Sequence, residues 1–202
     1  MSYRLYYFPI RGRGEQIRVL LHALDVPFEN EHVNGERFRE LRSQQPPPLD
    51  FAALPMLEDG EFRLVQGPVI MAYIGRAHGA SPSTPRQAAR AESITLAAED
   101  LRMQYFKLFG DDAAAKQAEF LDGPWTNRWL PAFERLLESN ESTQHFVGRD
   151  LTFADAAVWD VLDAFSTYIE GASVKGAPGL QAFYDDFAAR GSVAKYLGAR
   201  PA

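Results

Sequence analysis

The chain has 202 residues, of which 46% are hydrophobic, and this is enough to build one large domain or two small ones. Its formal net charge of -6 is unlike the basic surface of a general nucleic-acid binder. No apolar run approaches the ~20 residues of a membrane-spanning helix, and the first residues resemble no signal peptide. We therefore expect a cytoplasmic protein with neither a nucleic acid nor a membrane as its partner.

The sequence contains no cysteine, which excludes disulfide bonds, thiolate metal sites and a cysteine nucleophile. Any thiol chemistry must therefore use a sulfur atom that belongs to a substrate. The four histidines lack the spacing of metal ligands, so we expect no metal site. They are His22, His32, His78 and His145.

The amino-terminal residues predict a strand, a short loop and a helix. Aromatic and aliphatic residues occupy positions 3–8, and Pro9 cannot donate to a sheet ladder, so the strand should end there. Gly12 and Gly14 indicate a loop, and from Glu15 onward apolar residues recur at helical spacing. A strand that stops at a loop is a frequent position for an active site.

The following residues predict an α/β domain over residues 1–79. The further elements are a strand at 28–33, a short helix at 36–41, an irregular loop at the three prolines 46–48, two strands within 54–65 and a helix from 68. Asp59-Gly60 is a hairpin signal for the last two strands, whereas the first two strands need a parallel crossover. This order matches a thioredoxin-like domain, although the pattern alone leaves another α/β order open.

Residues 80–85 contain two prolines and read as a linker, and from residue 86 strand signals almost vanish. We therefore expect an all-helical second domain over residues 86–202. Thr152 and Asp155 have the spacing of a capping box at the start of one of its helices. Asp160, in the same helix, is either buried with a hydrogen-bond partner or exposed.

Residues 7–13, Tyr-Phe-Pro-Ile-Arg-Gly-Arg, and the helix after them resemble the amino terminus of tyrosine-type cytosolic glutathione transferases, nearest the pi and sigma classes. The resemblance covers nearly the whole chain. It implies that Tyr7 directs its hydroxyl at the sulfur of glutathione, while Tyr6 faces the other way. A free thiol with a pKa of ~8.5 is mostly protonated at neutral pH, so a hydrogen-bond donor to the thiolate raises the reactive fraction. The cation of Arg13 should favour the same negative charge.

The resemblance also implies the residues that hold the rest of glutathione. Leu54 and Pro55 match a segment in which a cis peptide presents backbone groups to the cysteinyl part. The expected glutathione-binding residues are Arg13, Phe38, Arg42, Leu54, Pro55, Gln66, Gly67 and, reaching across a dimer, Asp100. Three positions depart from the family pattern: Phe38 stands for a tryptophan, Ala53 for a glutamine and Gly67 for a serine. We expect Gly67 to weaken glutathione binding and Gly67→Ser to restore it.

Two more sets of residues follow from the resemblance. An open acceptor pocket is expected from Phe8, Ile10, Phe106 and Gly110. A homodimer is expected from Phe51, which resembles an aromatic key inserted into the partner, and from Arg76 and Glu92, which could pair across the same interface.

Three functions stay open at this point. The first is a glutathione transferase that conjugates the activated thiolate to small, mainly apolar electrophiles. The second is a glutathione-dependent isomerase of the sigma type, which regenerates the thiol. The third is a non-catalytic binding or structural relative, which the departures at Phe38, Ala53 and Gly67 would suit.

Overall fold

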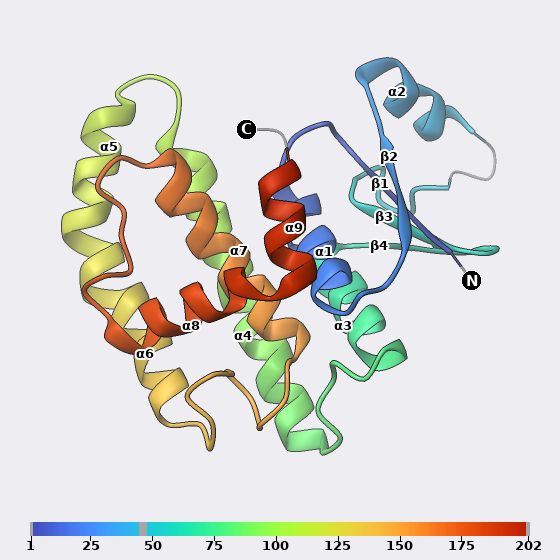
Figure 1. The fold of residues 1–202 in the computed structure, drawn as a ribbon. Coiled ribbons are helices and arrows are strands. Elements are labelled where there is room, and N and C mark those ends of the chain that lie inside the picture. The colour runs from blue at the N-terminus through green and yellow to red at the C-terminus, as the bar shows by residue number, and fades with distance from the viewer. Residues whose placement is uncertain (1, 45–47, 201–202) are drawn as a thin grey trace.

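The computed structural model describes residues 2–44 and 48–200 of the chain. Its first part contains four strands and three helices, and Figure 1 shows their arrangement. They are β1 (Tyr3–Tyr7), α1 (Gly12–Ala23), β2 (Phe28–His32), α2 (Gly35–Ser43), β3 (Met56–Asp59), β4 (Phe62–Val65) and α3 (Gly67–Ala77). The prolines at 46 and 47, for which the sequence predicts an irregular loop, lie outside the described residues.

The four strands form one sheet in the order β2-β1-β3-β4. β1 pairs with β2 in parallel, with Tyr3 opposite Phe28 and Tyr7 opposite His32. β3 runs antiparallel to both β1 and β4, and the turn between β3 and β4 contains Gly60 with a φ of 62°. The predicted crossover and hairpin are both confirmed.

Helix α1 begins at Gly12, three residues earlier than its apolar spacing predicts. The amide of Glu15 donates to the carbonyl of Arg11, so the glycines that we assigned to a loop lie in the first helical turn. Gly12 has a φ of 43°, a conformation that side chains with a Cβ rarely adopt. The prediction was wrong here because glycine usually marks a break, whereas these two glycines make room for a neighbouring side chain.

The second part of the chain is helical, and it starts with the 21-residue helix α4 (Pro85–Tyr105). Thr84 caps this helix, because its hydroxyl accepts a hydrogen bond from the Gln87 amide at 3.3 Å. The elements after α4 are a 3-10 turn (Phe106–Leu108), α5 (Ala113–Phe120), a π-helical segment (Leu121–Trp129), α6 (Leu130–Glu138), α7 (Phe153–Tyr168), α8 (Pro178–Ala189) and α9 (Gly191–Ala199). The exact limits 1–79, 80–85 and 86–202 stay predictions.

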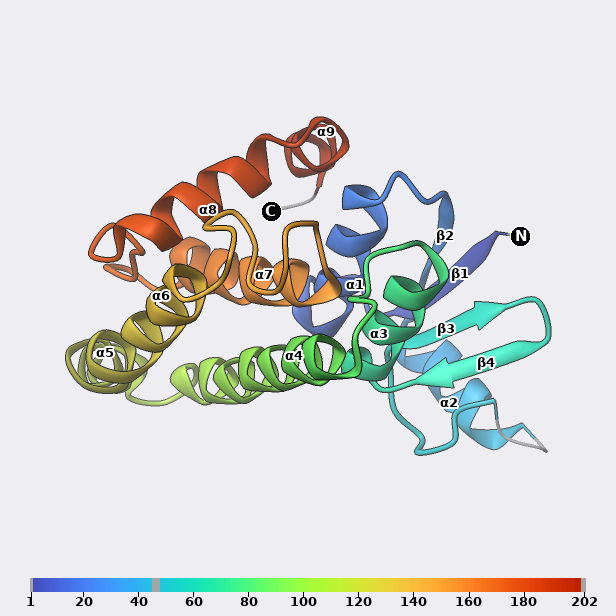
Figure 2. The same cartoon turned by 90° about the horizontal axis from the view of Figure 1, so that it is seen from below.

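Helix α7 is the centre of the helical part, and every residue from Phe153 to Phe165 is buried. In Figure 2 it lies between α4, α6 and α8. The predicted capping box is confirmed, because the Asp155 carboxylate accepts a hydrogen bond from the Thr152 amide at 2.6 Å. The mixed α/β part and the helical part together give the expected fold class.

Helix α1 joins the two parts, since it packs against the sheet, against α7 and against α9. The hydroxyl of Tyr196 in α9 lies 2.9 Å from both carboxylate oxygens of Glu15. Arg200 lies 3.1 Å from Glu15 and 2.6 Å from Asp163 in α7. These contacts fix α1, and with it the loop after β1, relative to the helical part.

Within residues 2–44 and 48–200, no helix combines the length and the apolar character that crossing a membrane requires. The cytoplasmic location that we expect from the sequence stays a prediction.

Candidate active site

Tyr7 ends β1 with its side chain against the start of α1. Its hydroxyl oxygen accepts a hydrogen bond from the backbone amide of Arg13 at 2.9 Å, and the residue is 6% exposed. Tyr6 points elsewhere, because its hydroxyl donates to Glu58 in β3 at 3.4 Å. A hydroxyl has one hydrogen to donate, and the bond from Arg13 leaves that hydrogen free.

Two glycines give Tyr7 its space. A Cβ on Gly12 would lie 2.6 Å from the Tyr7 hydroxyl oxygen, and a Cβ on Gly14 would lie 2.6 Å from the ring carbon Cδ1. Real Cβ contacts are longer than this, so a side chain at either position requires Tyr7 to move. Two glycines at i and i+2 after an aromatic strand could have indicated a close contact between the strand and the helix. We interpreted them as a loop instead.

Burial raises the pKa of Tyr7 above its ordinary value of 10.0, opposed by the Arg13 amide and by the charges of Arg13, Arg102 and Arg18. The phenol is therefore neutral at physiological pH and keeps its proton. A neutral hydroxyl with a free hydrogen can donate a hydrogen bond to an anion placed beside it.

The guanidinium of Arg13 forms an ion pair that the sequence did not predict, and the expected effect of its cation on the thiolate stays a prediction. Its Nε lies 2.6 Å from Oε1 of Glu99 in α4, and the carboxylate offsets much of its charge. The guanidinium also lies over the ring of Phe106, 5.7 Å from its centroid. The Arg13 group that donates to the Tyr7 hydroxyl is its backbone amide. No sequence pattern indicated Glu99 as the partner of the Arg13 side chain.

Glu99 extends this ion pair into the core. Nε of Arg102 lies 3.3 Å from Glu99 Oε2, and Nη2 of Arg102 lies 2.7 Å from the Asp160 carboxylate in α7. Burial raises the pKa of Asp160 to about 7, although the Arg102 charge opposes the shift. Of the two environments left open for Asp160, the buried and hydrogen-bonded one is correct.

Aromatic rings connect Tyr7 with α2. The centroids of Tyr7 and Phe8 are 5.6 Å apart, those of Phe8 and Phe38 are 5.4 Å apart, and the Arg42 guanidinium lies 5.6 Å from the Phe38 centroid. The structure therefore brings Phe8, Phe38 and Arg42 to the side of Tyr7 on which β1 ends.

The segments before β3 and before α3 complete the set of residues expected at the site. The Leu54–Pro55 peptide is cis, as the resemblance implies. Gln66 has a φ of 76° and is the N-cap of α3, so Gly67 is the first helical residue and the helix begins one residue before the predicted start at 68. The side chain of Gln16 in α1 lies directly beside Gly67, which the sequence did not indicate.

The structure does not bring all the residues predicted for the acceptor pocket into contact with Tyr7 or Arg13. Phe8 contacts Tyr7, and Phe106 contacts the Arg13 guanidinium. Ile10 is exposed and borders a hollow of about 460 Å³ with Pro9, Arg18 and Tyr196, and Tyr7 does not line this hollow. Gly110 is exposed with a φ of 86°, and its position in the acceptor pocket stays a prediction.

Among the residues expected at a subunit interface, Phe51 and Asp100 are exposed. Arg76 and Glu92, which we expected to pair between subunits, pair within one chain, with 3.6 Å between Nη1 and Oε1. The expectation missed this because α3 and α4 pack side by side, which brings the two residues together in the monomer.

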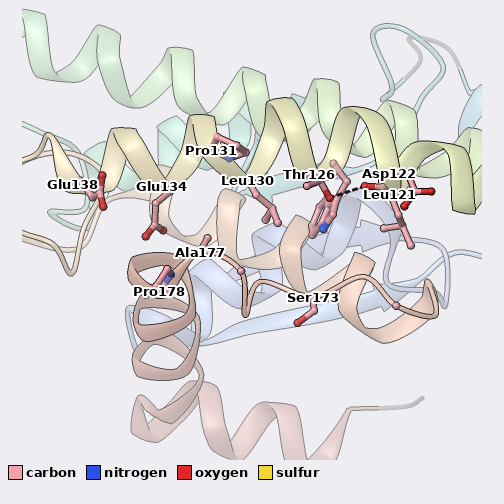
Figure 3. Close-up of a pocket in the computed structure, with 13 residues that line it drawn as sticks. Leu121, Asp122, Thr126, Leu130, Pro131, Glu134, Glu138, Ser173, Ala177 and Pro178 are labelled. Atoms are coloured by element: carbon pink, nitrogen blue, oxygen red, sulfur yellow. Dashed lines mark hydrogen bonds between the residues drawn. The ribbon is translucent and has the colours of Figure 1, made fainter.

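A second hollow, of about 640 Å³, lies in the helical part between the π-helical segment, α6 and the loop before α8 (Figure 3). None of the residues predicted for the site lines it. Among residues 2–44 and 48–200, no three histidine, aspartate or glutamate side chains gather in a way that could hold a metal ion. The expected absence of a metal stays a prediction.

Comparison with protein-family models decides the family. Residues 2–76 match the model described as Glutathione S-transferase, N-terminal domain, and residues 99–200 match the model described as Glutathione S-transferase, C-terminal domain. The chain belongs to the glutathione S-transferase family. The resemblance seen in residues 7–13 is thereby confirmed.

Known glutathione transferases match the chain along its whole length. Glutathione S-transferase P 1 of Xenopus laevis is 29% identical over 97% of this chain and 92% of its own length. Glutathione S-transferase 1 of Ascaris suum is 30% identical over 99% of this chain and 97% of its own length. The crystal structure of the glutathione S-transferase from Ascaris lumbricoides has a TM-score of 0.86 at 27% identity, covering 100% of this chain and 98% of that one.

The protein is therefore an enzyme, a glutathione transferase with glutathione as its co-substrate. In this glutathione transferase, the residues expected around the tripeptide come from β1, α1, α2, the segment before β3 and the start of α3. Sequence reasoning missed the residues that contact or position the expected site residues without being expected to bind glutathione themselves. They are Gly12, Gly14, Gln16, Glu99 and Arg102.

Proposed function

We propose that Tyr7 activates glutathione by donating a hydrogen bond from its hydroxyl to the sulfur and so stabilising the thiolate. The observation that supports this most is the bond from the Arg13 amide to the Tyr7 oxygen at 2.9 Å. It orients the hydroxyl and leaves its hydrogen available. Because burial raises the pKa of Tyr7, the donor stays protonated at neutral pH.

The rest of the tripeptide would lie along the groups around Tyr7. The backbone at the cis Leu54–Pro55 peptide would pair with the cysteinyl part, and Arg42 beside Phe38 would attract the glycyl carboxylate. The γ-glutamyl end would lie at Gln66 and Gly67, where α3 begins and its dipole favours negative charge. Each of these roles is a proposal that rests on the position of the residue.

The acceptor in this proposal is a small, mainly apolar electrophile that is held beside the sulfur by Phe8 and Phe106, with Ile10 and Gly110 at the edge. Phe106 is 41% exposed, and a surface phenylalanine next to the Arg13 guanidinium provides an apolar wall. The thiolate attacks the electrophilic atom, the sulfur–carbon bond forms, and the electron pair of the broken bond leaves with the displaced group or stays on the adduct.

We also propose that the enzyme is a homodimer with twofold symmetry, built on one face of α3 and α4. On α4, four of the exposed positions, 92, 96, 100 and 103, recur at intervals of four, four and three residues, which places them on one helical face. The side chains of this face are Val69, Arg76, Glu92, Leu96, Asp100 and Met103. In such a dimer the exposed Asp100 would reach the glutathione amino group of the partner site.

The substitution Tyr7→Phe tests the role of the hydroxyl. It deletes one oxygen and little volume, so folding should stay intact. The pKa of bound glutathione should rise by about two pH units, since one donor to the thiolate contributes about 2.7 kcal/mol. Titration of thiolate absorbance, together with turnover of a small aromatic electrophile, measures both effects.

Tyr6→Phe is the matched control for that experiment, because Tyr6 is as buried as Tyr7 but its hydroxyl donates to Glu58. It should leave the titration and the rate near those of the wild type. An unchanged titration in Tyr7→Phe would remove Tyr7 from the mechanism.

The wild type distinguishes the three functions. A product that contains no glutathione would point to the isomerase, and glutathione binding without turnover would point to the non-catalytic relative.

A further inference from the structure

Gly67, the first residue of α3, lies against the end of the Gln16 side chain. A Cβ at this position would lie 2.9 Å from Nε2 of Gln16 and 3.8 Å from the carbonyl oxygen of Arg13. A Cβ contact below 3.0 Å requires one of the two groups to shift. The expectation that Gly67→Ser restores glutathione affinity stays untested, but the Gln16 carboxamide occupies the space that a serine Cβ would need and so opposes it.

Gln16 itself is fully buried on α1. Its Nε2 donates only a long hydrogen bond, 3.4 Å, to the Arg13 carbonyl. Its Oε1 is buried, and none of the described residues gives it a hydrogen bond. Buried polar atoms normally have a partner, so the hydrogen bonds of this carboxamide do not explain its position. What it contributes is volume beneath Gly67.

The first turn of α3 depends on such support. Pro68 has no amide hydrogen, the amides of Val69 and Ile70 both donate to the Gln66 carbonyl, and the Gln66 side chain makes no capping bond. Gln66 also holds a φ of 76°, which is costly for a residue with a side chain. Packing of Gln16 against Gly67 therefore adds support to this turn.

We propose that Gln16 and Gly67 form a matched pair. In this pair, the Gln16 carboxamide supplies the volume of the missing side chain at position 67 and so positions the first turn of α3 for the γ-glutamyl end of glutathione. The proposal rests on the proposed glutathione site. Gln16 acts through Gln66 and Gly67 and has no contact with the reacting sulfur, so it is a positioning residue.

A double-mutant cycle tests the pair. Gly67→Ser alone should raise the dissociation constant of glutathione about tenfold, because the added Cβ displaces the Gln16 carboxamide. Gln16→Ala alone should raise it about fivefold, because the turn loses its support. In the double variant Gln16→Ala/Gly67→Ser, the dissociation constant should return to within about twofold of the wild-type value. The smaller alanine at position 16 leaves room for the serine, and the serine side chain replaces the volume that the Gln16 carboxamide supplied.

Two further variants separate the causes. Gln16→Met keeps the volume and removes both polar atoms, so it should bind glutathione within about twofold of the wild type. Gly191→Ser is the control for adding a serine side chain at the first residue of a helix, because a Cβ at Gly191 meets no atom within 4 Å. It should leave glutathione binding unchanged.

Calorimetric titration of reduced glutathione gives the dissociation constants, and steady-state kinetics give KM for glutathione, KM for the electrophile and kcat. Only KM for glutathione should follow the cycle, whereas general loss of structure would lower kcat as well. Independent effects, which multiply to about fiftyfold in the double variant, would overturn the pairing. So would a Gly67→Ser variant that binds as tightly as the wild type.

The failure of the pairing is distinguishable from the failure of the proposed function. A wild type that binds no glutathione would overturn both. A wild type that binds it, with the expected titration in Tyr7→Phe but independent effects in the cycle, would overturn only the pairing of Gln16 with Gly67.

Discussion

Gly14 lies closer to the Tyr7 ring than any side chain could. Because a Cβ there would be 2.6 Å from Cδ1 and 2.7 Å from Cγ of Tyr7, Gly14→Ala must push the ring away from its present position. We expect kcat/KM to fall by about ten- to hundredfold, since small displacements of a reacting group have effects of this size. The pKa of bound glutathione should rise at the same time, as measured by thiolate absorbance.

Gly123→Ala is the control for a glycine-to-alanine change within a helical segment, because a Cβ at Gly123 meets no atom within 4 Å. Its kinetics and titration should match those of the wild type. If Gly14→Ala behaves in the same way, the Tyr7 ring has more room than its contacts indicate, and the glycine has no role in positioning the hydroxyl.

Among the helices, α4 and α7 are joined by the buried pair of Arg102 and Asp160. Burial raises the pKa of Asp160 from 3.8 to about 7, so between these pH values the folded protein keeps a proton that the unfolded chain has released. The free energy of unfolding should therefore fall as the pH rises from about 4 to about 7, by roughly 1–4 kcal/mol from this residue.

Asp160→Asn removes this titration, and Arg102 retains Glu99 as an ionic partner. The pH dependence of the free energy of unfolding between pH 4 and 7, measured with urea, should be flatter in the variant than in the wild type. Asp150→Asn, at an exposed carboxylate, is the control. A variant with the same slope as the wild type would show that Asp160 is already ionised in the folded protein throughout this range.

At the scale of the whole molecule, the proposed dimer depends on the exposed side chain of Phe51. It is 69% exposed, and because it resembles an aromatic key, we expect a partner subunit to bury it. Phe51→Ala should raise the dimer dissociation constant by at least about tenfold, measured by sedimentation velocity over a range of protein concentrations.

Phe109→Ala is the control for that measurement, because Phe109 is also exposed but follows the 3-10 turn Phe106–Leu108 and is not part of the proposed dimer face of α3 and α4. It should not change the association state. A wild type that stays monomeric at high micromolar concentration would contradict the dimer and would also remove Asp100 from the glutathione site.

Much of the fold follows from signals that lie within a few residues of one another. Pro9 after an aromatic run fixes the end of β1, Asp59-Gly60 sets the hairpin, and Thr152 with Asp155 starts α7. Each of these depends on backbone conformation or on a hydrogen bond over three residues, so a single sequence contains the necessary information. The family resemblance likewise comes from the short run of residues 7–13.

The tertiary structure decided the rest, because the deciding contacts join residues that are far apart in the sequence. The start of α1 at Gly12 depends on the Tyr7 ring, and the charge of Arg13 depends on Glu99, 86 residues later. Gly67 lacks a side chain where Gln16 fills the space. Local patterns such as helical spacing and glycine content cannot report which side chain occupies a given volume, and only packing between α1, α3 and α4 determined it.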